Sequence, residues 1–197
     1  MDGTLYITGD AEADQLLNTD PFALLVGMLL DQQVPMAWAF RGPANLRRRL
    51  GHLDPVRIAA LTPDDVVAAF VQKPALHRYP AVMGRRVHAL AVFVTDVYDG
   101  EAARVWSGVE TGAELLARLK ALPGFGDEKA KIFVALLAKR VGVAPAGWEQ
   151  AARPFSDSTP RSVADSADAE SLRRVNEWKE AQRMAHKDKQ GRPLKQQ

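Results

Sequence analysis

A tight turn between two helix-forming segments is the feature that most constrains how this chain can fold. The turn has the sequence Leu-Pro-Gly-Phe-Gly and covers residues 122–126. Apolar residues keep a helical spacing on both sides of it, at Ala113, Leu116, Ala117 and Leu119 and again at Ile132, Phe133, Leu136 and Leu137. The pattern predicts two helices joined as a hairpin. Backbone N–H groups at the start of the second helix can hold a phosphate without reading any base.

The composition allows a folded core and leaves the function open. The chain has 197 residues, of which 47% are hydrophobic and 25% are charged, enough for one domain or two small lobes. The net charge of +2 is too small to demonstrate nucleic-acid binding by itself. Without cysteine, the chain cannot form a disulfide, a thiolate zinc site or a cysteine-ligated iron–sulfur cluster.

The same features predict a cytoplasmic protein. The absence of cysteine is consistent with a reducing compartment. The longest apolar run, residues 22–30, is too short to span a bilayer, and the first residues lack the basic region of a signal peptide. If the source is bacterial, we expect association with the nucleoid.

Helical spacing recurs along most of the chain and predicts an all-α fold. Helix starts are expected at Asp20, Thr62, Pro80, Thr111 and Asp168, where a capping residue or a proline precedes a periodic apolar pattern. Residues 35–50 also read as helical, with a kink or break at Gly42-Pro43. Only residues 4–7 alternate like a strand. The tryptophans at 38, 106 and 178 occupy helical positions and are expected in the core.

Residues 142–167 interrupt this pattern, and the last ten residues form a basic segment. The first stretch has little periodicity and three prolines, so we expect a long irregular loop. The second, residues 188–197, is expected to be a disordered basic tail that adds nonspecific attraction to DNA at most.

Two segments resemble the helix-hairpin-helix DNA glycosylase superfamily, the HhH-GPD proteins of base excision repair. Residues 122–130, LPGFGDEKA, are similar to the L-P-G-x-G-x-K-x-A hairpin of that superfamily. Residues 29–34, LLDQQV, resemble the helix end at which these enzymes keep a glutamine near the flipped-out base. The resemblance covers about residues 20–150.

The resemblance implies a two-lobed helical fold with double-stranded DNA in the cleft between the lobes. Residues 20–141, including the hairpin at 122–127, would form a helical barrel lobe, and residues 1–19 with 142–187 a second, smaller lobe. The expected DNA contacts are Leu122, Gly124, Phe125, Gly126, Lys129, Gln32 and Gln33. Arg78 and Tyr79 are further expected contacts, because residues 73–80 mix basic and aromatic side chains in an expected loop. The backbone carbonyls of Leu122 and Phe125 would hold a monovalent cation, and no other cofactor is expected.

The chain departs from the superfamily at two positions that matter for catalysis. Glu128 occupies the slot of the nucleophilic lysine found in lyase-active members, and Lys129 is rotated from it by about 100° along the helix. A Schiff-base mechanism is therefore not expected. No aspartate occupies the window at residues 143–150, where the superfamily keeps its catalytic carboxylate.

The carboxylates nearest to that window are Glu149 and, further along the loop, Asp157. Either could stabilise the sugar cation that forms when a base leaves, or direct a water molecule to it. Trp148, beside Glu149, is a candidate for lining the base pocket, because aromatic faces hold flipped bases.

The sequence therefore predicts a monomeric DNA-binding protein. The principal hypothesis is a monofunctional DNA glycosylase that hydrolyses the N-glycosidic bond of a damaged or modified base. A protein that binds distorted DNA without cutting it is the alternative. A third hypothesis is a helical interaction module that keeps the hairpin only as a fold element.

Overall fold

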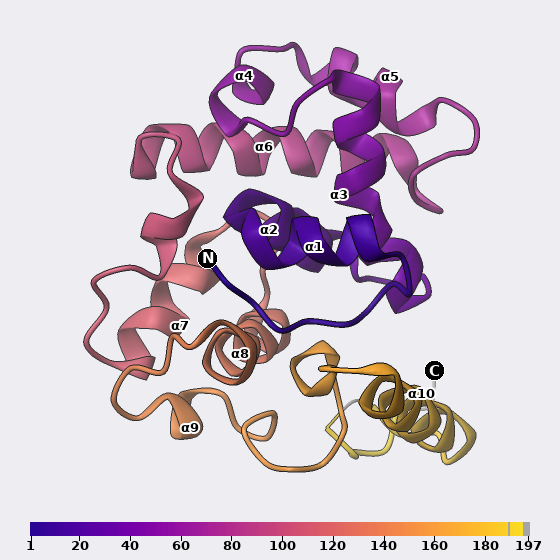
Figure 1. The fold of residues 1–197 in the computed structure, drawn as a ribbon, viewed down its shortest axis with the longest axis vertical. Coiled ribbons are helices and arrows are strands. Elements are labelled where there is room, and N and C mark those ends of the chain that lie inside the picture. The colour runs from indigo at the N-terminus through magenta and orange to yellow at the C-terminus, as the bar shows by residue number, and fades with distance from the viewer. Residues whose placement is uncertain (189, 195–197) are drawn as a thin grey trace.

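The chain folds into a set of packed helices (Figure 1). The computed structural model describes residues 1–188 and 190–194, and within these residues it has no β-strand, which confirms the predicted all-α class. The α-helices are α1 (Ala11–Thr19), α2 (Pro21–Leu30), α3 (Met36–Leu50), α4 (Pro55–Ala59), α5 (Pro63–Val71), α6 (Pro80–Tyr98), α7 (Gly112–Ala121), α8 (Asp127–Leu136), α9 (Trp148–Ala151) and α10 (Ala169–Met184). Two 3-10 turns, η1 (Ala102–Val105) and η3 (Val163–Asp165), and a π-helical turn, η2 (Leu137–Val141), complete these elements.

Helix α2 forms the centre of the core. All of its residues from Phe22 to Leu30 are buried. A helix that is apolar on every face needs neighbours on every side, and α1, α3 and α6 pack against α2 (Figure 1). The carboxyl end of α2 is therefore held rigidly from several directions, and the loop that follows it begins from a fixed point.

The predicted helix starts are confirmed where a side chain caps the helix. The Asp20 carboxylate accepts hydrogen bonds from the amides of Phe22 and Ala23 at the start of α2. Thr62 forms a capping box with Asp65 at the start of α5. These bonds satisfy amides that have no partner within the helix.

A kink or a break was expected at Gly42-Pro43, and the break is excluded because α3 runs as one helix from Met36 to Leu50. A side chain at position 42 would collide with Leu30 of α2. The glycine therefore allows α3 to lie close to α2, and the packing between the two helices outweighs the hydrogen bond that Pro43 cannot donate.

Residues 4–7 are extended but belong to no sheet. The Thr4 amide donates to the Arg140 carbonyl at 2.9 Å and the Tyr6 amide to the Ser166 carbonyl at 3.3 Å. Leu5 and Ile7 are buried, whereas Tyr6 is exposed. The alternation that suggested a strand arises because an extended chain buries every second residue against whatever surface it crosses.

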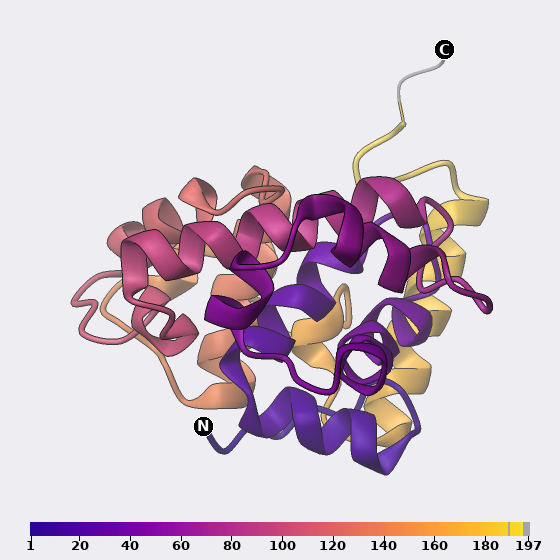
Figure 2. The ribbon, with the colours of Figure 1, turned by 90° about the horizontal axis from the view of Figure 1, so that it is seen from above.

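The two ends of the fold are built from different helices. Helices α7 and α9 lie on one flank, and α10 lies on the other (Figures 1 and 2). Helix α1 packs on α2 and α3, while η3 packs on α8 and α10.

The described helices include none with the length and apolarity of a membrane span.

The tail expected to be disordered, residues 188–197, contains a turn in its described part. The Asp188 amide donates to the Arg192 carbonyl at 2.8 Å, and the Leu194 amide to the His186 carbonyl at 2.8 Å. Gln190 of this turn reaches α8, as described below. Residues 189 and 195–197 of the expected tail lie outside the described residues.

The three tryptophans expected in the core differ in burial. Trp106 is buried and Trp178 is half-buried under the Arg161 guanidinium, 5.5 Å from its ring. Trp38 is 38% exposed, so the prediction of a core position was wrong for this residue. It lies in the first turn of α3 and faces His77 of a neighbouring loop instead of the core.

Candidate nucleic-acid interface

The turn between α7 and α8 presents backbone groups to the outside. The Phe125 amide donates to the Leu122 carbonyl at 3.1 Å, and Gly124 between them has φ +82°. Proline at the second position and glycine at the third are typical of a type II turn. Leu122 and Phe125 are buried and fix the turn to the core, whereas Gly124 and Gly126 are exposed.

The first turn of α8 is left uncapped by side chains. Gly126 is its N-cap residue, and it has no side chain to accept from the amides that follow. A Cβ added at Gly126 would meet nothing within 4 Å, so the space in front of these amides is open. Amides that the N-cap residue does not bond, together with the positive end of the helix dipole, favour an anion at this position.

Lys129 points inward from this helix. Its ammonium donates to the carbonyl oxygens of Met28 at 2.6 Å and Leu29 at 2.8 Å, at the carboxyl end of α2. It also lies 5.8 Å from the centre of the Phe125 ring. A cation is favoured at the carbonyl end of a helix. The structure thus places Lys129, expected to contact DNA, as a link between the hairpin and the central helix.

The acidic residues at the start of α8 have cationic or amide partners. Asp127 lies 2.8 Å from the Lys131 ammonium and 3.1 Å from that of Lys120. Hydrogen bonds from Lys131 and Lys120 lower the pKa of Asp127. The Glu128 carboxylate accepts from the Gln190 side-chain amide at 3.0 Å. The charge of Asp127 is therefore balanced locally, while Glu128 is the negative charge that borders the open amides.

Gln32 and Gln33 lie beside the hairpin but have different surroundings. The Gln32 side-chain amide donates to the Leu29 carbonyl at 2.6 Å, and its oxygen accepts from the Arg86 guanidinium at 2.8 Å. Gln33 is exposed and has φ +57°, a conformation that costs free energy in a residue with a side chain. Its side-chain oxygen accepts from the Tyr79 hydroxyl at 3.3 Å.

His77 fixes the loop that carries Arg78 and Tyr79. The Tyr79 amide donates to Nδ1 of His77 at 3.0 Å, so the ring proton lies on Nε2, which is 3.2 Å from the Leu30 carbonyl and donates to it. His77 is buried, and this burial lowers its pKa. The neutral ring thus joins this loop to the end of α2. Arg78 lies 5.4 Å from the Tyr79 ring.

Two cavities adjoin each other at residues 31 and 32. The larger, of about 820 Å³, lies between residues 6–9, residues 31–37 and one face of α10. The smaller, of about 420 Å³, lies between the end of α2 and residues 126–129 and 132. Asp31 and Gln32 line both cavities. The amides of the hairpin and the large cavity are therefore separated by this one loop.

Glu149 and Trp148 lie at the other end of the α7–α8 pair. They belong to α9, which packs against the beginning of α7, where a side chain on Gly112 would strike the Trp148 backbone. Helix α7 has 10 residues, so its two ends are about 15 Å apart. Glu149 borders a separate cavity of about 320 Å³. Neither residue lines the two cavities at residues 31 and 32.

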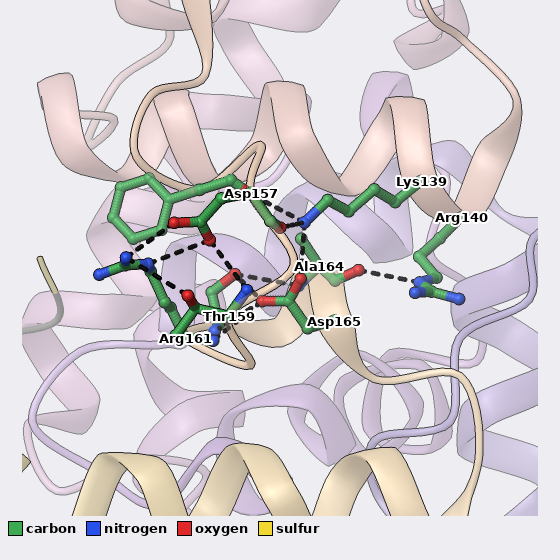
Figure 3. Close-up of polar contacts among 9 residues, drawn as sticks. Lys139, Arg140, Asp157, Thr159, Arg161, Ala164 and Asp165 are labelled. Carbon is green, nitrogen blue, oxygen red and sulfur yellow. Dashed lines mark hydrogen bonds and ion pairs between the residues drawn. The ribbon is translucent and has the colours of Figure 1, made fainter. Parts of the chain in front are cut away.

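Asp157 takes part in a network that holds the loop 155–165 in place (Figure 3). Its carboxylate accepts from Arg161 at 2.7 Å and from the Thr159 amide at 3.0 Å. Burial acts to raise the pKa of Asp157, but these hydrogen bonds outweigh it and keep the pKa below its ordinary value. Lys139 donates to Asp165 at 2.7 Å in the same network. The ionised Asp157 carboxylate therefore supports this loop. It does not line the cavity beside the hairpin.

Sequence reasoning missed several residues that line the large cavity. Asp31 was visible as a carboxylate that directly follows a wholly apolar helix, next to the glutamine pair. The face of α10, with Arg173, Asn176, Glu177 and Lys179, had no detectable signal because this helix is about 140 residues away in the chain.

The carbonyls of Leu122 and Phe125 meet only part of what a monovalent cation requires. Carbonyl oxygens are suitable ligands for hard cations, which take about six or more oxygens. The Leu122 carbonyl already accepts the hydrogen bond of the turn. Two protein oxygens would therefore need phosphate oxygens or water to complete the shell, and the function proposed below does not depend on a cation.

Comparisons with protein-family models, with curated proteins and with solved structures found no match to this chain.

Proposed function

We propose that this protein is a DNA-binding N-glycosylase that acts on a nucleotide extruded from duplex DNA. The observation that carries the proposal is the position of the loop at residues 31 and 32, between the open amides of the α7–α8 turn and a cavity of about 820 Å³. A phosphate on the amides, a sugar beside the loop and a base in the cavity form one continuous path for a single nucleotide.

The hairpin supplies contacts to the sugar-phosphate backbone. The exposed glycines at 124 and 126 allow close approach of the strand, and the uncapped amides of α8 donate to a phosphate. Such contacts position DNA without reading its sequence. Double-stranded DNA is the proposed partner, bound by a monomer, and a bacterial cell would hold this complex in its cytoplasm.

The large cavity supplies the site for the base. Its volume falls within the range of small-molecule sites, about 300–1,000 Å³. Its lining is mainly apolar, with Tyr6, Val34 and Met36, and polar groups come from the loop at residues 31–33 and from α10. Flipped bases are held in this way, by apolar and aromatic faces with a few polar contacts.

Asp31 is the carboxylate that we assign to the chemistry, in place of Glu149 and Asp157. It borders both cavities, so it lies where the sugar must pass. When the C1′–N bond breaks, its electron pair leaves with the base and positive charge develops on the sugar, which the carboxylate stabilises. Water then bonds to C1′ and gives a proton to Asp31, while the base takes a proton from solvent.

The same geometry argues against Schiff-base chemistry. The Lys129 ammonium is bound to two carbonyls of α2, and Glu128 occupies the position next to it. An amine must be neutral and reach the sugar to form a Schiff base. The expected product is therefore an abasic site in an intact strand.

Base release tests the catalytic part of the proposal. Duplexes with alkylated, deaminated or oxidised bases are incubated with the protein, and abasic sites are then cleaved with alkali. We expect release by the wild type and a loss of about 10²- to 10⁴-fold in Asp31→Asn. Glu149→Gln is the matched control and should retain activity. Equal activity of Asp31→Asn and wild type would remove Asp31 from the mechanism.

Gly126→Asp tests the binding part without weakening the fold. Aspartate is a preferred N-cap residue, so its carboxylate should accept from the α8 amides and stabilise the helix. The same carboxylate would occupy the proposed phosphate site and repel DNA. We expect unchanged or higher stability with weaker duplex binding. DNA binding by the wild type without release of any base would leave the non-catalytic binding protein as the function.

A further inference from the structure

Three aromatic rings form a row beside the loop at residues 31–33. His77 lies in the middle, with its ring centre 6.3 Å from that of Trp38 and 6.1 Å from that of Tyr79. The Trp38 and His77 rings are inclined by 28° and stack. His77 is 1% exposed, whereas Trp38 is 38% and Tyr79 is 41% exposed. Two large aromatic side chains that reach the surface therefore each contact the same buried ring.

The row is held rigidly. Trp38 belongs to the first turn of α3, and both ring nitrogens of His77 are hydrogen-bonded, to the Leu30 carbonyl and the Tyr79 amide. The Tyr79 hydroxyl is bound to Gln33, which is itself in the left-handed conformation. Binding of a ligand to these rings would therefore have a small entropic cost, because the rings are already ordered.

The surroundings of the row suit a nucleic acid. The Arg78 guanidinium lies over the Tyr79 ring at 5.4 Å and is exposed to solvent. Lys73 of the same loop is also exposed. Arg86 donates to Gln32 in the loop at residues 31–33, next to the row. Exposed aromatic rings next to cations bind single-stranded nucleic acids by stacking on bases while the cations attract phosphates.

We propose that Trp38 and Tyr79 form a stacking platform for an unpaired nucleobase of the bound DNA. This inference rests on the proposed function, because the hairpin must bring the DNA to this face. The base would stack on an exposed aromatic face, and Arg78 would contact the adjoining phosphate. The platform lies outside the two cavities, so it is a second base site beside that of the extruded nucleotide.

The test compares two duplexes of identical sequence, one fully paired and one with a single unpaired base. We expect Trp38→Leu and Tyr79→Leu to weaken binding of the second duplex about 5- to 150-fold, the range of one base-aromatic stack. Binding of the paired duplex should change less than 2-fold. Trp38→Phe and Tyr79→Phe retain an aromatic face and should restore most of the affinity. Trp178→Leu, on α10, is the control for loss of an aromatic ring.

The outcomes separate the platform from the proposed function. Gly126→Asp should weaken both duplexes equally, since it acts on the phosphate contacts. The wild type and the aromatic variants are compared by their relative affinity for the two duplexes. If the wild type binds both duplexes and the variants prefer the unpaired base as strongly as the wild type does, the platform is refuted and the DNA-binding function stands. If the wild type binds neither duplex, both proposals fail, and the exposed rings then belong to a surface for a different partner.

Discussion

The Lys129 ammonium donates to the carbonyl oxygen of Leu29 at 2.8 Å, across 100 residues of sequence. The bond connects the start of α8 to the last turn of α2. Through it the turn at residues 122–126 is held against the most buried helix of the fold, next to the loop with Asp31 and Gln32. The ammonium of Lys129, a residue expected to contact DNA, thus bonds to the carboxyl end of α2 and holds the hairpin against it.

Replacing Lys129 by methionine should destabilise the protein by about 1.5–3 kcal/mol, because hydrogen bonds from a charged donor to two helix-end carbonyls are lost. Urea unfolding followed by circular dichroism measures the change. Lys131→Met is the matched control. Lys131 pairs with the exposed Asp127, so its removal should cost less than about 1 kcal/mol. Equal costs for the two variants would contradict a structural role for Lys129.

Gly124→Ala should be more destabilising than Gly142→Ala. Both glycines have positive φ, +82° and +79°. The backbone cost, about 1–2 kcal/mol, is therefore shared. A methyl group at 124 would lie 2.5 Å from the Leu29 side chain, whereas at 142 it would meet nothing within 4 Å. The difference in unfolding free energy between the variants isolates the contact of the turn with α2, and a difference of zero would show that Leu29 moves aside freely.

Stability should fall on the acidic side of neutrality because of His77. Its pKa is lowered in the folded state, mainly by burial. The unfolded chain therefore takes up a proton below pH of about 6.5 while the folded ring stays neutral. The free energy of unfolding should be full above this pH and decrease as the pH falls towards the lowered pKa.

His77→Gln should reduce that dependence. Glutamine can replace part of the hydrogen bonding but does not titrate. Unfolding of wild type and variant at pH 5 and pH 7.5 gives the two slopes, and the lowered pKa of His52 contributes to both and cancels. Parallel slopes would show that protonation of His77 is not coupled to folding.

Glu128→Gln should strengthen binding of duplex DNA about 2- to 10-fold at low salt. The variant removes a negative charge beside the proposed phosphate site and keeps a side chain that can bond to Gln190. The gain should shrink as salt rises, because the repulsion is screened. Fluorescence anisotropy across a salt series measures it, with Glu149→Gln on the distant α9 as the control. A gain that is independent of salt would point to a cause other than charge.

Lys139→Met should destabilise the protein by about 3–5 kcal/mol. Its ion pair with Asp165 is 2.7 Å long, and the two side chains are 16% and 10% exposed. Removing Lys139 takes the cationic partner from the mostly buried Asp165 carboxylate, which keeps its hydrogen bonds from Arg161 and Ser162. Arg161→Met should cost less, because its partner Asp157 is 44% exposed. Thermal unfolding ranks the two variants, and the reverse order would contradict this account of the network in Figure 3.

Local sequence was sufficient for most of the helices and for the turn. Asp20-Pro21 and Thr62-Pro63 begin helices because the cap and the proline act within four residues. The turn at 122–126 follows from the preference of proline and glycine for its two central positions. Such signals depend on neighbours along the chain.

The candidate site could not be assembled in this way. A tryptophan is typical of the core and a lysine of the surface. The structure shows the opposite, because Trp38 is exposed and Lys129 points inward. Their surroundings come from residues 77 and 28–29, which are distant in sequence. Burial and hydrogen bonding at such positions are decided by which helices pack together.

The sequence alone determined the all-α class, the capped helix starts and the Pro-Gly turn, because backbone preferences and capping bonds are local interactions. Only the tertiary structure decided that Asp31 and Gln32 lie between the hairpin and a cavity, and that Glu149 and Asp157 lie elsewhere. The physical reason is that close packing around α2 joins segments through contacts of long sequence separation, and no pattern within one segment encodes its partner in another.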